Sequence, residues 1–441
     1  MLQLLYAAAY TFVLVFFLTI EVEKTKKVMP SVSLCFRVHQ PYRLKQHALN
    51  NIGTLHHYED TEANGSAINT VADECYLRAN EIILEQIKKT AGQFKVAFSI
   101  SGTVLELLQQ YRPDVIASFK QLIATGSVEI LAETYNNSLS WLHSKMEFKT
   151  QVEKHTALVK KIFNVQPLVF RNTELIYNNE LARFIADAGF KGMICEGLAR
   201  ILKGRTANQT YAAPCNGDFG VLLRNAELSD DIAFRFGATG WSQHPLTAQK
   251  FADWLHAHNA DDTDNINLFF DYETFGIHKK ESSGIFDFLK HLPDEILAKE
   301  DLYFKTPAEA LDTYYPKDIY DVPETISWED KTNDCCLWSE NVMQHNSIRK
   351  IYRIENMVLK SEDEAVIDTW RRLQTVDYFY YMCLHRRCEG DVYDLLNPFA
   401  SSKEAFQTYN AILTDFEIAI IKAGLAKNQH QFSNQIQSNL Y

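Results

Sequence analysis

The fold is decided by residues 266–278, which read Ile-Asn-Leu-Phe-Phe-Asp-Tyr-Glu-Thr-Phe-Gly-Ile-His. An apolar run with one asparagine ends abruptly in two carboxylates, Asp271 and Glu273, and His278 follows shortly after. A buried parallel strand whose C-terminal end opens into an active site has this pattern. Aromatic rings beside carboxylates suit a sugar, which has apolar faces and a rim of hydroxyl groups. We therefore expect Asp271 to be one half of a catalytic carboxylate pair.

Upstream of this stretch, apolar segments alternate with mostly helical patterns. Segments whose apolar residues alternate or run continuously predict strands, and apolar residues spaced three and four apart predict helices. The predicted strands are 31–38, 94–100, 128–132, 168–170, 191–195, 220–223 and 266–270. The predicted helices between them are 71–89, 104–124 with a break at Pro113, 145–163, 179–188 and 247–258.

Seven strands with helical connections predict an α/β fold with a parallel sheet, and a closed barrel is its natural form. The active site of such a barrel lies at the C-terminal ends of the strands. The polar residues at or just after these ends are His39, Ser101, Glu133, Glu174, Glu196, Arg224 and Asp271. Four carboxylates and one arginine are more than solvated loops usually carry, so we expect these ends to form a site.

The pattern changes after the predicted barrel, which we assign to residues 29–300. Residues 293–323 predict irregular linking structure with a few short helices. Amphipathic helical patterns then occupy 338–359, 362–386 and 403–423. We expect a helical C-terminal domain over 301–427, with the aromatic cluster 378–381 in its core, and a frayed tail over 428–441.

Composition limits the possible functions. The chain has 441 residues, of which 46% are hydrophobic, and its net charge of −12 argues against a nucleic-acid partner. The eight cysteines contain no Cys-x-x-Cys, which favours reduced thiols in the cytosol. The sequence has no His-x-x-x-His, no Gly-rich phosphate loop and no Gly-x-Ser-x-Gly elbow. We therefore expect no metal and no cofactor.

Residues 1–28 leave three interpretations open. The run 2–20 is almost wholly apolar, but it lacks the preceding basic residues and the cleavage site of a signal peptide. It is just long enough to span a bilayer, and the lysines that follow it would leave the main body in the cytoplasm. Alternatively translation starts at Met29, directly before the first strand, which we favour. The anchor and the later start both predict a cytoplasmic enzyme.

The chemistry that these residue types support best is glycoside hydrolysis by a carboxylate pair. Four stretches, in order, then resemble glycoside hydrolase family 57, the α-amylases and related α-glucan enzymes. They are His-Gln-Pro at 39–41, Gly-Ser-Val-Glu-Ile-Leu at 126–131, Arg-Asn-Thr-Glu at 171–174 and Asp-Tyr-Glu-Thr-Phe-Gly at 271–276. Residues 334–341, with Trp338, are a weaker fifth match. Many family members read Trp-Leu-Pro-Glu where this chain has Arg-Asn-Thr-Glu. With this departure, the chain resembles a subgroup of bacterial proteins labelled α-amylase.

The resemblance implies a distorted (β/α)7 barrel followed by a helical domain, and a retaining mechanism on α-glucosidic bonds. It implies that Glu174 is the nucleophile, that Asp271 is the general acid/base and that His39 hydrogen-bonds the sugar in the −1 subsite. The residues that we expect to bind substrate are His39, Gln40, Glu133, Glu196, Arg224, Trp241, Glu273, His278 and Trp338.

The expected partner is an α-glucan or maltooligosaccharide substrate, without an obligatory protein partner. Two alternatives to hydrolysis stay open: a 4-α-glucanotransferase or branching enzyme with the same carboxylates, and a non-catalytic α-glucan-binding protein on a degenerate barrel.

Overall fold

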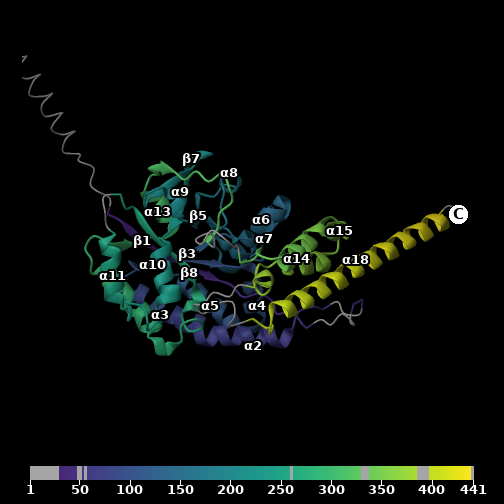
Figure 1. Cartoon of the computed structure of the whole chain (residues 1–441), viewed down its shortest axis with the longest axis horizontal. Coiled ribbons are helices and arrows are strands. Elements are labelled where there is room, and N and C mark those ends of the chain that lie inside the picture. The colour runs from purple at the N-terminus through teal and green to yellow at the C-terminus, as the bar shows by residue number, and fades with distance from the viewer. Residues whose placement is uncertain are drawn as a thin grey trace, which may run out of the picture.

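The computed structural model describes residues 29–46, 52–53, 57–258, 262–328, 337–384 and 397–438, with side chains as far as residue 424. The apolar segment 1–28 lies outside the described residues. A lobe of strands and surrounding helices carries a group of helices at one side, from which the helix α18 (Ser402–Ser438) extends outward (Figure 1). None of the helices in the described ranges is long and apolar enough to cross a membrane.

Seven parallel strands form a ring in the order β1-β2-β3-β4-β5-β7-β8 and back to β1. The prediction of a seven-stranded barrel is therefore confirmed. The strands are β1 (Ser31–Val38), β2 (Val96–Ile100), β3 (Val128–Leu131), β4 (Val169–Arg171), β5 (Gly192–Glu196), β7 (Asn216–Arg224) and β8 (Asn265–Asp271).

The ring is distorted at two seams. β3 and β4 are joined only through Ala132, which donates to the carbonyl of Val169 (2.9 Å) and accepts from Arg171 N–H (2.8 Å). β7 and β8 share a single residue pair. β7 meets β8 so briefly because most of that edge of β7 pairs antiparallel with β6 (Thr210–Ala213). Residues 210–213 lie in a stretch that the sequence predicted to be a loop, because so short a strand leaves little periodic signal.

Helices cover the outside of the ring. The main ones are α2 (Thr61–Val71), α3 (Leu77–Lys89), α4 (Gly102–Tyr111), α5 (Pro113–Ile123), α7 (Lys145–Phe163), α8 (Asn179–Asp187), α10 (Ala226–Asp230), α11 (Ala248–Ala257) and α12 (Ile285–Leu297). Pro113 begins α5, as the predicted break requires. Two predictions are wrong: the first helical region starts at Thr61 rather than near residue 71, and Pro293 lies inside α12, whose apolar face is buried.

The interior of the barrel is layered. One apolar residue from each strand forms a layer, which consists of Cys35, Ala97, Leu131, Val169, Ile194, Leu222 and Phe269. Side chains on a strand alternate, so the residue two positions further along faces the same interior. Those residues are Arg37, Ser99, Glu133, Arg171, Glu196, Arg224 and Asp271. A polar ring therefore lies at the C-terminal mouth, above an apolar layer.

The opposite end of the barrel is closed by α13 (Pro307–Thr313), whose Ala308 and Ala310 pack against the apolar layer together with Tyr314. Two short strands flank this helix: β9 (Tyr303–Phe304) pairs with β1, and β10 (Asp318–Ile319) pairs with β6. Residues just beyond 300 thus pack with the barrel strands, while the domain boundary predicted at 300 stays a prediction.

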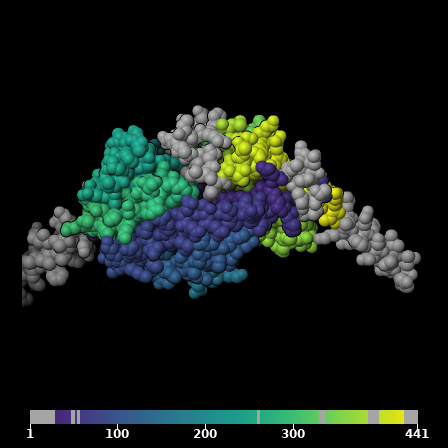
Figure 2. Space-filling model, turned by 90° about the horizontal axis from the view of Figure 1, so that it is seen from below, coloured from purple at the N-terminus to yellow at the C-terminus, as the bar shows by residue number. Residues whose placement is uncertain are grey.

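The C-terminal helices are α14 (Val342–Arg353), α15 (Glu355–Lys360), α16 (Glu364–Arg372), α17 (Asp377–Tyr380) and α18. They share one hydrophobic cluster with α7, α8 and strands β4 to β7. The N-terminal part of the chain also reaches them, because Tyr58 donates to Asp415 of α18 (2.9 Å). Figure 2 shows this purple segment running along the molecule toward the yellow helix.

Candidate active site

The two predicted catalytic carboxylates meet on one arginine. Arg37, on β1, donates from Nη1 to Glu174 Oε1 (3.0 Å). It also donates from Nε to Asp271 Oδ1 (2.6 Å) and from Nη2 to Asp271 Oδ2 (3.1 Å). Because β1 pairs with β2 on one side and β8 on the other, the arginine backbone is held rigidly beside Asp271. One planar guanidinium therefore links both acids.

Glu174 is enclosed. It follows β4 in the short helix η3 (Thr173–Leu175), and its side chain is 0% accessible. Its second oxygen, Oε2, accepts from Trp328 Nε1 (2.7 Å) and from the hydroxyl of Tyr380 (2.6 Å). Burial raises the pKa of Glu174, and the Arg37 charge and these two donors oppose that rise. The donors come from three distant parts of the chain.

The backbone at Glu174 is strained. Its φ is 56° and its ψ 25°, and the φ of the following Leu175 is 50°. Left-handed geometry is uncommon for residues other than glycine and costs about 1–3 kcal/mol at each position. Such strain persists only where surrounding contacts enforce it, and it clusters at functional sites.

Asp271 is the more open partner. It is the last residue of β8, opposite Arg37 in the strand register, and its side chain is 13% accessible. Asp271 is thus in contact with solvent, whereas the side chain of Glu174 is not.

His39 is held on both ring nitrogens. Nδ1 lies 2.6 Å from the Ser101 hydroxyl and Nε2 lies 2.8 Å from Asp377 Oδ2. Thr375 also donates to Asp377 (2.8 Å). Burial alone would raise the pKa of Asp377, but His39 and, more weakly, Arg37 outweigh it and hold it at about 2. Asp377 on α17 therefore connects the helical part to the first motif.

The other polar residues of the mouth form compensated pairs. Arg171 donates to Glu133 (2.9 Å), and Ser99 contacts both of them. Arg224 donates to Glu196 (3.2 Å) and to Asp230 of α10 (2.5 Å). Together with Arg37 and Asp271, the ring holds three arginines, each paired with a carboxylate from a neighbouring strand.

Glu273 and His278 lie beside Asp271. Burial, followed by the Asp271 charge, raises the pKa of Glu273 to about 7, against hydrogen bonds from Tyr76 and Gln40. The His278 amide donates to the Glu273 carbonyl (2.9 Å). Burial lowers the pKa of His278 to about 4, and Asp271 opposes this. Gln40, Glu273 and His278 thus come together at the end of β8.

Two predicted substrate-binding residues lie elsewhere. The Trp241 ring contacts Trp254 of α11 (6.0 Å between centroids) and Arg235, on the outside of the barrel. Trp338 is buried behind Tyr380, with 6.2 Å between the ring centroids. No contact in the described ranges joins either tryptophan to Glu174 or Asp271. The start of the weaker fifth motif, residues 334–336, lies outside the described residues.

Four residues at the site were missed from the sequence: Arg37, Trp328, Asp377 and Tyr380. A signal existed for Arg37, a charge within an apolar strand two positions before His39 and thus on the same face. Tyr380 belongs to the aromatic cluster 378–381, which was predicted to be core, and Asp377 directly precedes that cluster. Tyr378 and Phe379 are indeed core residues, but Tyr380 reaches Glu174.

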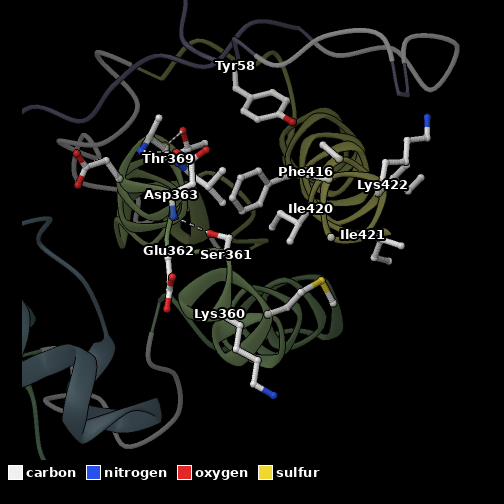
Figure 3. Close-up of a pocket in the computed structure, with 18 of the residues that line it drawn as sticks. Tyr58, Lys360, Ser361, Glu362, Asp363, Thr369, Phe416, Ile420, Ile421 and Lys422 are labelled. Atoms are coloured by element: carbon white, nitrogen blue, oxygen red, sulfur yellow. Dashed lines mark hydrogen bonds between the residues drawn. The ribbon is translucent and has the colours of Figure 1, made fainter. Parts of the chain in front are cut away.

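A cavity of about 1450 Å³ lies apart from these carboxylates, between α15, α16 and α18. In Figure 3, Phe416 and Ile420 of α18 face the helix that carries Asp363 and Thr369. None of the carboxylates of the barrel mouth lines it, so it is distinct from the candidate site.

Residues 33–323 match the sequence model of Glycosyl hydrolase family 57. The chain belongs to this family. A relative named putative alpha-amylase from Methanocaldococcus jannaschii is 38% identical over 416 residues, which cover 92% of this chain and 87% of the relative. The 4-alpha-glucanotransferase of Thermococcus litoralis is 21% identical over 62% of this chain and 41% of its own length.

Solved structures share the fold. The crystal structure of that glucanotransferase matches with a TM-score of 0.62 at 17% identity and covers 80% of this chain and 56% of its own. A family 57 branching enzyme from Thermococcus kodakaraensis matches with a TM-score of 0.60 at 14% identity, over 80% of this chain and 86% of its own. The predicted fold, a family 57 barrel followed by helices, is confirmed.

Proposed function

We propose that this glycoside hydrolase is retaining and cleaves α-1,4-glucosidic bonds in glycogen- or starch-type glucans or maltooligosaccharides. The observation that carries the proposal is the Arg37 guanidinium shared by Glu174 and Asp271. Retaining enzymes need carboxyl groups about 5–5.5 Å apart, whereas inverting enzymes need roughly 6.5–9.5 Å. The shared guanidinium holds the two carboxylates as a close pair, and the separation of their carboxyl carbons in a crystal structure tests the retaining assignment.

The proposed roles are those that the resemblance to family 57 implies, and the greater exposure of Asp271 supports them. Glu174, buried and facing a cation, attacks the anomeric carbon, and the glycosidic C–O bond breaks as Asp271 gives its proton to the leaving oxygen. In the second half, Asp271 takes a proton from water, whose oxygen attacks the same carbon and releases Glu174. Asp271 is the partner in contact with solvent, which suits both proton transfers.

The sugar-binding roles are proposals of the same kind. His39, oriented by Ser101 and Asp377, is placed to hydrogen-bond the reacting sugar. Mouth residues that suit sugar hydroxyl groups are Gln40, Glu133, Glu196, Arg224, Glu273 and His278. Trp241 and Trp338 lie apart from the carboxylates, so we assign them no part in binding at this site.

Transfer to a second glucan is the other candidate, because relatives include a 4-alpha-glucanotransferase and a branching enzyme. The same carboxylates serve, and only the acceptor of the glycosyl group differs. Incubation with maltoheptaose separates the two: new reducing ends indicate hydrolysis, and longer products indicate transfer.

The test of the catalytic assignment is a pair of isosteric variants. Glu174→Gln and Asp271→Asn should each lower turnover of maltoheptaose by about 10³-fold or more without unfolding the protein. The control is Glu129→Gln, a half-buried carboxyl away from the mouth, which should keep its turnover. Near-normal turnover in either catalytic variant contradicts that residue's role. Glucan binding by a wild type without any turnover would favour a non-catalytic binding protein.

A further inference from the structure

The predicted nucleophile cannot be reached as the site stands. The side chain of Glu174 is fully buried, and the groups that cover it divide between its two oxygens. Trp328 and Tyr380 hold Oε2, while Arg37 is the donor to Oε1. Among the residues that the structure describes, these three donors are the hydrogen-bonding partners of Glu174 that could make room for a sugar.

The retaining reaction identifies which group stands in the way. The anomeric carbon must come within about 3–3.5 Å of the attacking oxygen, with the glycosidic oxygen beside Asp271. Arg37 already fills this position, with Nη1 3.0 Å from Glu174 Oε1 and Nε 2.6 Å from Asp271 Oδ1. The hydrogen bonds from Trp328 and Tyr380 reach Glu174 but not Asp271, so these two residues do not lie between the acids.

We infer that the Arg37 guanidinium occupies the position that the reacting glucosyl unit takes and that substrate binding moves it off both carboxylates. Oε1 of Glu174 is then the attacking oxygen, while Trp328 and Tyr380 keep Oε2 oriented. The inference rests on the proposed retaining function and adds a positioning residue to it.

The surroundings give the displaced guanidinium a place. Its backbone is fixed in β1, but its long side chain can rotate. The Trp328 ring lies 5.2 Å from the guanidinium carbon, within the range of a cation–π interaction. The carboxylate of Asp377 is close enough to Arg37 to be influenced by its charge. Arg37 can thus leave the two acids without leaving the mouth.

This arrangement makes two opposite predictions for Arg37→Ala. A neutral sugar no longer has to displace a cation and meets carboxylates free to accept its hydroxyl groups, so it should bind more tightly. The displaced guanidinium stays in the mouth and still favours the ionised form of the nucleophile at longer range, so turnover should fall when the guanidinium is removed. A residue that merely supported the fold would weaken binding and turnover together.

The experiment measures the Kd of maltotriose by calorimetry and kcat on maltoheptaose. We expect Arg37→Ala to lower Kd by about tenfold and kcat by about 100-fold, since each contact involves a charged group. Guanidinium at millimolar concentration should raise the Kd of the variant again and restore part of kcat. The matched control is Arg371→Ala, which removes a buried arginine paired with Glu147 away from the mouth. It should leave Kd unchanged.

A second measurement avoids the folding of the variant. A crystal structure of the wild type with an uncleaved sulfur-linked maltooligosaccharide should show a sugar ring between Glu174 and Asp271 and the Arg37 guanidinium moved away. A sugar bound with Arg37 still on both carboxylates, or an unchanged or higher Kd in Arg37→Ala, overturns the inference. If the wild type turns over no α-glucan at all, the proposed function fails instead, which the substrate assay reports separately.

Discussion

The two ends of the barrel treat buried charge in opposite ways. At the mouth, three arginines are each paired with a carboxylate, and the ring is polar on every strand. At the closed end, the half-buried Glu129 lies under α13 and accepts hydrogen bonds from the Ala308 amide (2.9 Å) and from Thr306. Burial raises the pKa of Glu129 to about 7. Three carboxylates of the mouth thus lie against guanidinium groups, whereas burial favours the neutral form of Glu129 at the closed end.

The largest expected effect comes from breaking a pair at the mouth. Arg171→Met leaves Glu133 buried without its cation, and removing one partner of a buried pair costs about 3–5 kcal/mol. Urea unfolding measures the loss in free energy of unfolding. Lys191→Met, which removes an exposed partner of Asp312, should cost at most about 1 kcal/mol. Equal losses in the two variants would contradict the contrast between buried and exposed pairs.

At the closed end, removing a charge should raise the free energy of unfolding rather than lower it. The folded protein binds the Glu129 proton more tightly than the unfolded chain, so this group favours folding below its ordinary pKa of 4.5 and loses that contribution as pH rises toward about 7. The difference corresponds to roughly 3 kcal/mol above pH 7. Glu129→Gln should therefore raise the free energy of unfolding by about that amount at pH 8 and change it little near pH 4.5. A gain that is the same at both pH values would contradict this assignment.

A smaller effect is expected where the helical part meets the mouth. Tyr380→Phe removes a hydrogen bond of 2.6 Å to the charged Glu174. Losing such a bond costs about 1.5–3 kcal/mol, so kcat/KM should fall roughly 10- to 100-fold. Tyr378→Phe is the matched control, because its hydroxyl donates to the backbone of Tyr42 instead. Comparable losses in both variants would indicate a structural role for α17 rather than a direct one for Tyr380.

The smallest expected change is in the pH profile of Tyr380→Phe. Burial raises the pKa of Glu174, and the Tyr380 hydroxyl opposes that rise. Without the hydroxyl the pKa rises further, and because the nucleophile must be ionised, activity should be lost at a higher pH on the acidic side. The measurement is kcat/KM from pH 4 to pH 8. An acidic limb that stays in place, or moves to lower pH, would contradict the contact.

The seven barrel strands were predictable because each carries its own local pattern. Asp271 and Glu174 were noticed because they lie at or shortly after such segments, and the resemblance to family 57 supplied their roles. Arg37 was missed because its contact with Asp271 exists only when the ring closes and β8 lies beside β1. Trp328 and Tyr380 could not be placed, because their contact with Glu174 depends on packing between segments far apart in the chain. The strand β6 was not predicted, because a segment of four residues is too short to show a periodic pattern.

The position of Tyr380 in the chain has a consequence for how the enzyme is made. Tyr380 lies 206 positions after Glu174, and the last barrel strand already ends at Asp271. A ribosome therefore delivers every strand of the ring before it delivers the hydroxyl group that contacts the proposed nucleophile. The proposed catalytic centre is complete only when the helical part has been synthesised and has folded against the barrel.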